Sequence, residues 1–196
     1  MMLGLAASGC SRPALEAVTS LAGRTCATAP DLTAARLIEF DVADTNRVDL
    51  DATGPCLGGA GGPSLYAIFQ LPNVPAPYVV NVASERRGQT MASLRLTLLD
   101  AQGGETRTVP RASFVQRGRD LTSTLRVRPG ERYLVVASDP ATVGQQSRDI
   151  TSATQTQAVG YPLLVQVNTG SEEVTSTRYA HNGTVRVAAR PLPRAE

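Results

Sequence analysis

Alternation of apolar and polar residues in short segments limits the fold of this chain most, because a period of two is typical of half-buried β-strands. Leu94, Leu96 and Leu98 fall on one face of such a strand, and Arg95 and Thr97 fall on the other. The same pattern recurs at 125–128 and at 185–190. The sequence therefore predicts several strands that bury one face and leave the other in water.

Further strands are predicted where β-branched and aromatic residues cluster. These segments lie at 37–42, 65–71, 78–83, 113–116, 133–137 and 163–168. Turn-forming residues at 100–104, at Pro129-Gly130 and at Asn182-Gly183 predict tight connections between strands. Short strands at regular intervals with little helix predict an all-β fold, an antiparallel β-sandwich over 35–190.

One interruption of the strand pattern has helical character. Asp139 offers an N-cap, and Pro140 follows at the first helical position, where its missing N–H is tolerated. This pair predicts one short helix over 141–150, directly after the strand at 133–137. Residues 151–159 are then expected to form a loop.

The start of the chain resembles a bacterial lipoprotein signal. Small residues lead up to Cys10, and Ser8 and Gly9 suit a peptidase that needs slim side chains before the cysteine. This predicts that residues 1–9 are removed and that the Cys10 thiol carries diacylglycerol. Ser11 in place of Asp is typical of lipoproteins carried to the outer membrane, so we expect a periplasmic, lipid-anchored protein. The alternative is an ordinary N-terminus with an incidental cysteine, since no Arg or Lys precedes Cys10, and Met1 need not be the true start.

The residues after Cys10 are small and polar, with a weak apolar stripe at Leu15, Val18 and Leu21. Residues 10–34 are therefore expected to form a tether with at most one short helix. The sandwich domain would follow over 35–190, and residues 191–196 would form a tail.

Two cysteines remain once Cys10 is assigned to lipid. Cys26 and Cys56 lie in irregular stretches and can form a disulfide in an oxidising compartment. Such a bridge would stabilise the fold by about 3.5 kcal/mol on the chain-entropy model. Two free, partly buried thiols are the alternative. A zinc site is not expected, because two cysteines and one histidine at wide spacing do not make a tetrahedral site.

Length and charge exclude several classes of function. A chain of 196 residues suits one domain, and no apolar run approaches the roughly 18 residues of a transmembrane helix. The formal charge of +2 is too small for a nucleic-acid binder, which must displace many counterions. All 19 basic residues are arginines, which indicates a GC-rich genome more than a function.

The sequence contains no recognisable complete set of catalytic residues. His181 is the one imidazole, and its place beside a predicted turn favours a solvated loop residue over a catalytic base. The glycine-rich segment 58–62 lacks the Lys-Ser/Thr ending of a phosphate loop and is expected to be a flexible connection. We therefore expect no enzyme activity, no metal ion and no cofactor.

Aromatic residues are the usual platform for sugars, and this chain has no Trp. Tyr78 and Tyr161 share the parity of buried neighbours, so they are expected in the core. Tyr66, Tyr133 and Tyr179 are the candidates for a binding surface, although core packing is the commoner fate of such tyrosines.

Arginines on the solvent faces of strands offer a second candidate surface. Arg95, Arg126, Arg128 and Arg186 are all predicted to point away from the core and could form an anion-binding face. The alternative, which the nearly balanced charge favours, is that they only keep strand edges from aggregating.

Four segments in order resemble the maltose-operon periplasmic protein (MalM) family. They are 62–72, 94–100, 128–136 and 181–187, and the similarity of layout spans about 35–190. The resemblance implies an exported, non-enzymatic envelope domain linked to maltose and maltodextrin uptake. It carries over no functional residue.

These observations predict an exported envelope lipoprotein with an accessory β-sandwich that binds a partner protein or a carbohydrate. One alternative is a sugar-binding module that acts beside a maltodextrin transporter. Another is a structural or protein-binding outer-membrane lipoprotein unrelated to sugar uptake. The expected partners are the membrane, through the lipid, and either an envelope protein or maltodextrin.

Overall fold

The computed structural model describes residues 15–40, 46–59, 61–74, 77–159 and 165–192. Cys10, Tyr161 and most of the predicted tail lie outside these ranges, as do residues 10–14 of the predicted tether. Within the described ranges, no helix is both long enough and apolar enough to cross a membrane.

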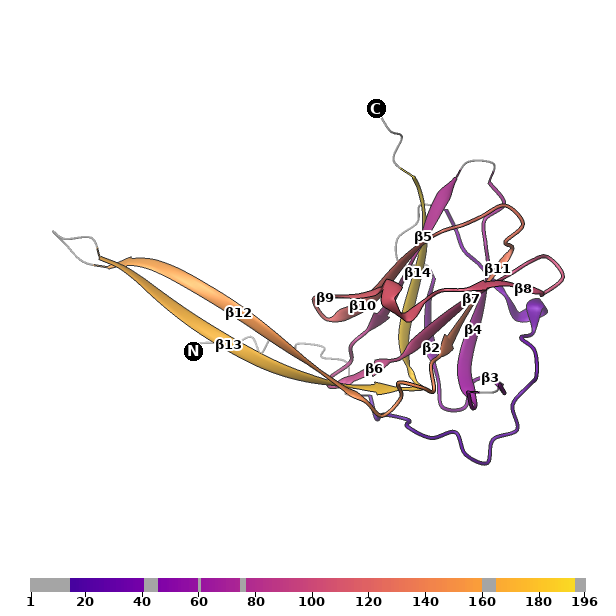
Figure 1. The fold of residues 1–196 in the computed structure, drawn as a ribbon, viewed down its shortest axis with the longest axis horizontal. Helices are drawn as coiled ribbons and strands as arrows, with labels where there is room; N and C mark the ends of the chain where they lie inside the picture. Colours follow the sequence, from indigo (N-terminus) through magenta and orange to yellow (C-terminus); the bar gives the residue numbers. More distant parts are fainter. Residues whose placement is uncertain (1–14, 41–45, 60, 75–76, 160–164, 193–196) are drawn as a thin grey trace, which may run out of the picture.

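Two β-sheets pack face to face, which confirms the predicted all-β sandwich (Figure 1). The six-stranded sheet contains β1 (Arg36–Leu37), β4 (Ser64–Gln70), β11 (Tyr133–Ser138), β7 (Leu94–Leu99) and β8 (Glu105–Thr108), in that order, with β3 (Cys56–Leu57) also paired to β4. The five-stranded sheet has the order β2 (Arg47–Leu50), β14 (Gly183–Pro191), β5 (Tyr78–Glu85), β10 (Asp120–Arg126) and β9 (Phe114–Arg117). All pairs in the two sheets are antiparallel except β1 with β4.

The core lies between the two sheets, where the inner faces of the strands meet. Leu96 and Val136 from the six-stranded sheet and Val82 from the five-stranded sheet are fully buried. The alternation predicted for 94–98 is present, because Leu94, Leu96 and Leu98 are buried while Arg95 and Thr97 are half-buried. Burial of each such side chain contributes about 1.5–3 kcal/mol.

The N-terminal segment lies against the sandwich and is bound to it by hydrogen bonds and a disulfide. We call residues 15–34 the strap. Its only helical turn is the 3₁₀ turn η1 (Leu32–Ala34), where Leu32 packs on the outer face of the six-stranded sheet. Tyr66 and Ile68 of β4 lie under this cover, which explains why residues of both faces of β4 are buried.

A long two-stranded arm leaves one end of the sandwich (Figure 1). It consists of β12 (Gln146–Val159) and β13 (Val165–Ala180), paired over fourteen residues, and β6 (Thr90–Ala92) joins its base in parallel. The predicted helix over 141–150 and loop over 151–159 are both wrong. Asp139 caps only a turn, Gly144 adopts a positive φ of 85°, and the chain then enters β12.

The predicted turns differ in what they connect. Asp100 and Gly104 close a hairpin between β7 and β8, as predicted. Pro129-Gly130 and Asn182-Gly183 instead carry the chain from one sheet to another, so neither closes a hairpin. Gly183 is needed there because a Cβ atom would lie 2.7 Å from the backbone nitrogen of Ala92.

The 3₁₀ turn η2 (Arg111–Ser113) connects β8 to β9 and so links the two sheets. We refer to the end of the sandwich where β14 begins at Gly183 as the root end, since the arm leaves there. The opposite end, where β14 reaches Pro191 beside Tyr78, is the groove end.

Candidate functional site

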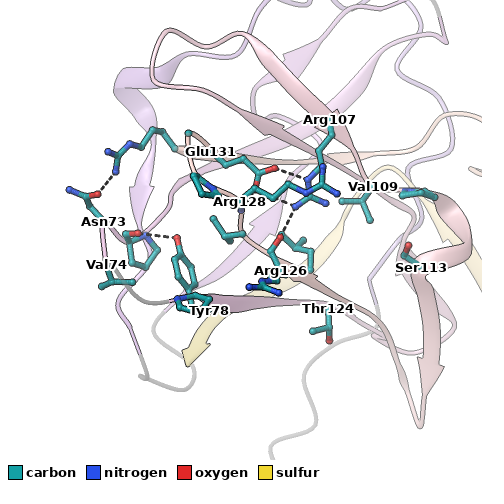
Figure 2. Close-up of a pocket in the computed structure, with 18 residues that line it drawn as sticks. Asn73, Val74, Tyr78, Arg107, Val109, Ser113, Thr124, Arg126, Arg128 and Glu131 are labelled. Carbon is teal, nitrogen blue, oxygen red and sulfur yellow. Dashed lines mark hydrogen bonds and ion pairs between the residues drawn. The ribbon is translucent and has the colours of Figure 1, made fainter. Parts of the chain in front are cut away.

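A groove of about 1010 Å³ opens at the groove end of the sandwich (Figure 2). Its walls come from the start of β5, the end of β10 and the crossing from β10 to β11, together with residues 72–74 and the segment after β8. Strand ends meet here because β5, β10 and β11 all begin or end at this edge. The volume is at the upper limit of a small-molecule pocket, and the groove is open to solvent.

An ion pair holds one wall of the groove in place. Arg107 Nε donates to Oε1 of Glu131 at 2.6 Å, and its NH2 group donates to Oε2 at 3.2 Å. The Arg128 backbone N–H donates to the same Oε2 at 2.7 Å, and Arg107 NH2 also donates to the Arg126 carbonyl at 2.7 Å. Arg107 therefore links β8 of one sheet to β10 of the other through the crossing between the sheets. We call Arg107 and Glu131 the clasp.

Glu131 is the one carboxylate among the residues that line the groove, and Arg107 engages it. Three further arginines line the groove. Arg126 and Arg128 are exposed, and no ion pair within the described ranges engages either side chain. Arg132 also lines the groove and donates to the Asn73 side chain. Four arginines against one glutamate give the groove a net charge of +3, while the whole chain carries +2.

Tyr78 forms part of the groove floor. Its hydroxyl donates to the Pro72 carbonyl at 2.9 Å, and its ring meets Phe40 edge to face with centroids 5.6 Å apart. Burial raises the pKa of this phenol to about 12, with Glu131 adding to the rise and Arg132 opposing it. Tyr78 is therefore neutral and hydrogen-bonded, and it shapes the groove without supplying charge. Its burial agrees with the prediction from parity.

The three tyrosines predicted as a binding surface do not come together. Tyr66 is only 6% exposed, and its hydroxyl accepts from the Asp31 backbone N–H at 3.1 Å under the strap. Tyr133 is half-buried against the same outer cluster. Tyr179 lies at the base of the arm, with the Arg111 guanidinium 5.3 Å from its ring centroid. They form no common platform.

His181 is buried, which overturns the expectation of a solvated loop residue. It is 4% exposed, and its Nδ1 lies 2.8 Å from the Ser138 hydroxyl. That hydroxyl accepts from the Leu65 backbone N–H at 2.9 Å, which leaves its proton for Nδ1. Burial lowers the pKa of His181 below its usual value. The sequence placed His181 beside a surface turn, but this segment joins β13 to β14, where Val18 of the strap and Ser138 of β11 both contact His181.

The predicted disulfide is present. Cys26 and Cys56 join with an S–S distance of 2.04 Å and attach the strap to β3 at the edge of the six-stranded sheet. Arg24 strengthens the same attachment by donating to the carbonyls of Ala52 and Gly54, both at 2.6 Å.

The four arginines predicted to share an anion-binding face separate into different environments. Arg126 and Arg128 line the groove. Arg186 is engaged by Glu85 at 2.6 Å and Asp120 at 2.7 Å, and Arg95 lies on the other sheet. Sequence reasoning missed Arg107 and Glu131 altogether. The Pro129-Gly130 turn placed Glu131 at a strand entry, but no local signal joins it to Arg107, 24 residues away.

No protein-family model matches the chain, and no curated protein matches it significantly in sequence. The functional interpretation therefore depends on the geometry of the groove, the strap and the buried histidine.

Proposed function

We propose that this chain is an exported lipoprotein of the cell envelope that binds a partner at its groove end and carries out no chemistry. The lipid on Cys10 would anchor it in the outer membrane, with the sandwich in the periplasm. The observation that carries this proposal is the path of the strap, which begins near Cys10 and is held at the end opposite the groove.

Hydrogen bonds hold the start of the strap at the root end. Val18 N–H donates to Asn182 Oδ1 at 2.8 Å, and His181 N–H donates to the Val18 carbonyl at 2.8 Å. Asn182 Nδ2 donates to the Glu16 carbonyl, also at 2.8 Å. A lipid on Cys10 would be at most about 18 Å of extended chain from Leu15. The anchor would therefore hold the root end near the bilayer and leave the groove end accessible.

The disulfide supports export. Bridges of this kind persist in oxidising compartments such as the periplasm and are rare in the cytosol. The Cys26–Cys56 bridge closes a loop with a sequence separation of 30 and fixes the strap that would follow the lipid. A tether fixed in this way transmits the position of the anchor to the sandwich.

Two features favour binding over catalysis. His181, the one histidine, is buried with Ser138 and is not part of the groove. The groove has one carboxylate, and Arg107 engages it on both oxygens, so no free acid–base pair is available there.

The alternative, a maltodextrin-binding module as the resemblance to the MalM family implies, has weaker support. Sugar recognition by stacking needs exposed aromatic rings. Tyr66 is covered by the strap, and Tyr133 and Tyr179 are half-buried in separate places. Calorimetry with maltose through maltoheptaose tests this alternative, and heat released at millimolar ligand would favour it over a protein partner.

Acylation of Cys10 tests the main proposal. The full chain is expressed in a Gram-negative host and labelled with an alkyne analogue of palmitate, followed by membrane fractionation. We expect label and membrane association for the natural chain and the loss of both in Cys10→Ser. The double variant Cys26→Ser, Cys56→Ser is the matched control, because it removes two cysteines and should keep the label. An unlabelled, cytosolic protein with reduced Cys26 and Cys56 would contradict the proposal.

A further inference from the structure

We infer that the groove binds an extended acidic peptide segment of a protein partner, with carboxylates at alternate residues facing Arg126 and Arg128. This inference rests on the proposed function in that it names the partner chemistry of the groove end. Three features of the groove support it: exposed cations without a carboxylate partner among the described residues, the spacing of these cations, and apolar side chains in the lining.

The positive charge of the groove is available to a ligand. Arg126 and Arg128 are exposed, and within the described residues neither side chain has a carboxylate partner. Guanidinium groups bind carboxylates through paired, charge-assisted hydrogen bonds. By contrast Arg186, on a neighbouring strand, is already engaged by Glu85 and Asp120. Within the described residues, the groove therefore presents two exposed cations that no carboxylate of the chain engages.

The spacing of the two arginines fits an extended chain. They are two residues apart on a segment that continues β10, and the Val127 backbone between them donates to the Tyr78 carbonyl at 3.1 Å. Residues two apart on a strand project to the same side and are about 6.8 Å apart along it. Carboxylates at alternate residues of an extended peptide have the same spacing. A single small anion would instead need cations that converge on one point.

The clasp preorganises the groove for binding. Glu131 is engaged by Arg107 on both oxygens, so it does not compete for Arg126 and Arg128. The bond from Arg107 to the Arg126 carbonyl fixes the backbone from which Arg126 projects. A fixed backbone lowers the ordering cost of binding, which favours affinity.

Apolar side chains also line the groove and suit the side chains that alternate with the carboxylates. They are Val74, Pro77 and Val109, together with the ring of the neutral Tyr78. A volume of about 1010 Å³ exceeds what an inorganic anion fills, and an open groove admits a chain that enters and leaves at both ends.

Fluorescence anisotropy with a labelled decapeptide of alternating Glu and Ala tests the inference on the full chain. We expect saturable binding that weakens as salt rises from 50 to 300 mM, because exposed charges are screened. A peptide with Gln in place of Glu should bind at least about tenfold more weakly, since charged hydrogen bonds are roughly twice as strong as neutral ones.

A double variant and a matched control locate the binding. Arg126→Gln, Arg128→Gln should weaken binding at least about tenfold, because two charge-assisted contacts are lost. Arg117→Gln, Arg119→Gln removes the same charge from two exposed arginines at the same spacing, about 20 Å away at the other end of β10. This control should change binding less than about twofold, as expected for screened, distant charge. Both variants should keep the natural urea midpoint, since all four side chains are exposed.

Several outcomes would overturn the inference. They are an equal loss of binding in the two double variants, equal binding of the Glu and Gln peptides, or competition by inorganic pyrophosphate as strong as that of the acidic peptide. Absence of binding while Cys10 is acylated would reject the acidic-peptide partner and leave the lipoprotein proposal intact. Binding by a chain that is never acylated would do the reverse.

Discussion

The root end and the groove end of the sandwich differ in how their central polar side chains are buried and paired. At the root end, Ser138, His181 and Asn182 are buried and satisfy one another or the strap. At the groove end, Glu131 of the clasp is buried and Arg107 is half-buried, but Arg126 and Arg128 are exposed, and no ion pair within the described residues engages their side chains. Buried groups must find partners within the chain, whereas exposed charges remain available to another molecule. The contrast supports the proposed attachment at the root end and the proposed recognition at the groove end.

The largest expected effect comes from opening the attachment of the strap. Cys26→Ser with Cys56→Ser removes a bridge with a sequence separation of 30, and we expect unfolding to become easier by about 3.5 kcal/mol, because the unfolded chain gains entropy. Urea unfolding of the oxidised natural chain and the variant measures the loss. Peptide affinity at the groove should stay unchanged in the folded variant, and a parallel loss of affinity would show that the two ends are coupled.

The next effect comes from breaking the clasp at the groove end. Arg107→Met keeps the apolar stem but leaves the Glu131 carboxylate buried, with its side chain only 2% exposed. We expect a loss of about 3 kcal/mol, near the low end for a broken buried pair because Arg107 is partly exposed. Urea unfolding at neutral pH measures it.

A second variant separates charge from packing at the clasp. Arg107→Met combined with Glu131→Gln removes the unpaired charge, so it should recover part of the stability lost by Arg107→Met alone. If the double variant is as unstable as the sum of the two single variants, the two residues do not interact and the clasp is not an energetic unit.

The smallest expected effect is a pH dependence of folding stability that arises from His181 at the root end. Burial lowers the pKa of His181 in the folded state, so below its unfolded value near 6.5 the unfolded chain binds more protons. The contribution of neutral His181 to the free energy of unfolding is therefore fully present above about pH 6.5. It is lost as the pH falls toward the pKa of His181 in the folded state. The urea midpoint of the natural chain should therefore be lower at pH 5.5 than at pH 7.5. His181→Gln should reduce that difference, and an undiminished difference would place the titrating group elsewhere.

The predictions that succeeded depend on neighbours in the sequence. Leu94, Leu96 and Leu98 alternate with polar residues, and the pleat of a strand sends them to one side whatever the rest of the chain does. Asp100 and Gly104 likewise form their turn through their own hydrogen bonds, with Gly104 N–H donating to Asp100 Oδ1 at 2.8 Å. The disulfide could be predicted because only two cysteines remained once Cys10 was set aside.

The predictions that failed depended on pairing with other strands. Residues 146–159 carry no clear apolar face, and their strand forms through pairing with β13 over fourteen residues. Asn182-Gly183 has the sequence of a hairpin turn, but β14 joins β5 and β2 instead of β13, and His181 is buried as a result. Local propensity is weak compared with such pairing.

The sequence by itself determined that this chain makes strands, where most of them lie, and which cysteines can bridge, since these follow from side-chain periodicity and elimination. Only the tertiary structure decided that Arg107 meets Glu131, that the strap attaches at the root end, and that Arg126 and Arg128 line a groove. The reason is physical: such contacts join segments that are separated in the sequence, and their energies exist only after the two sheets have packed together.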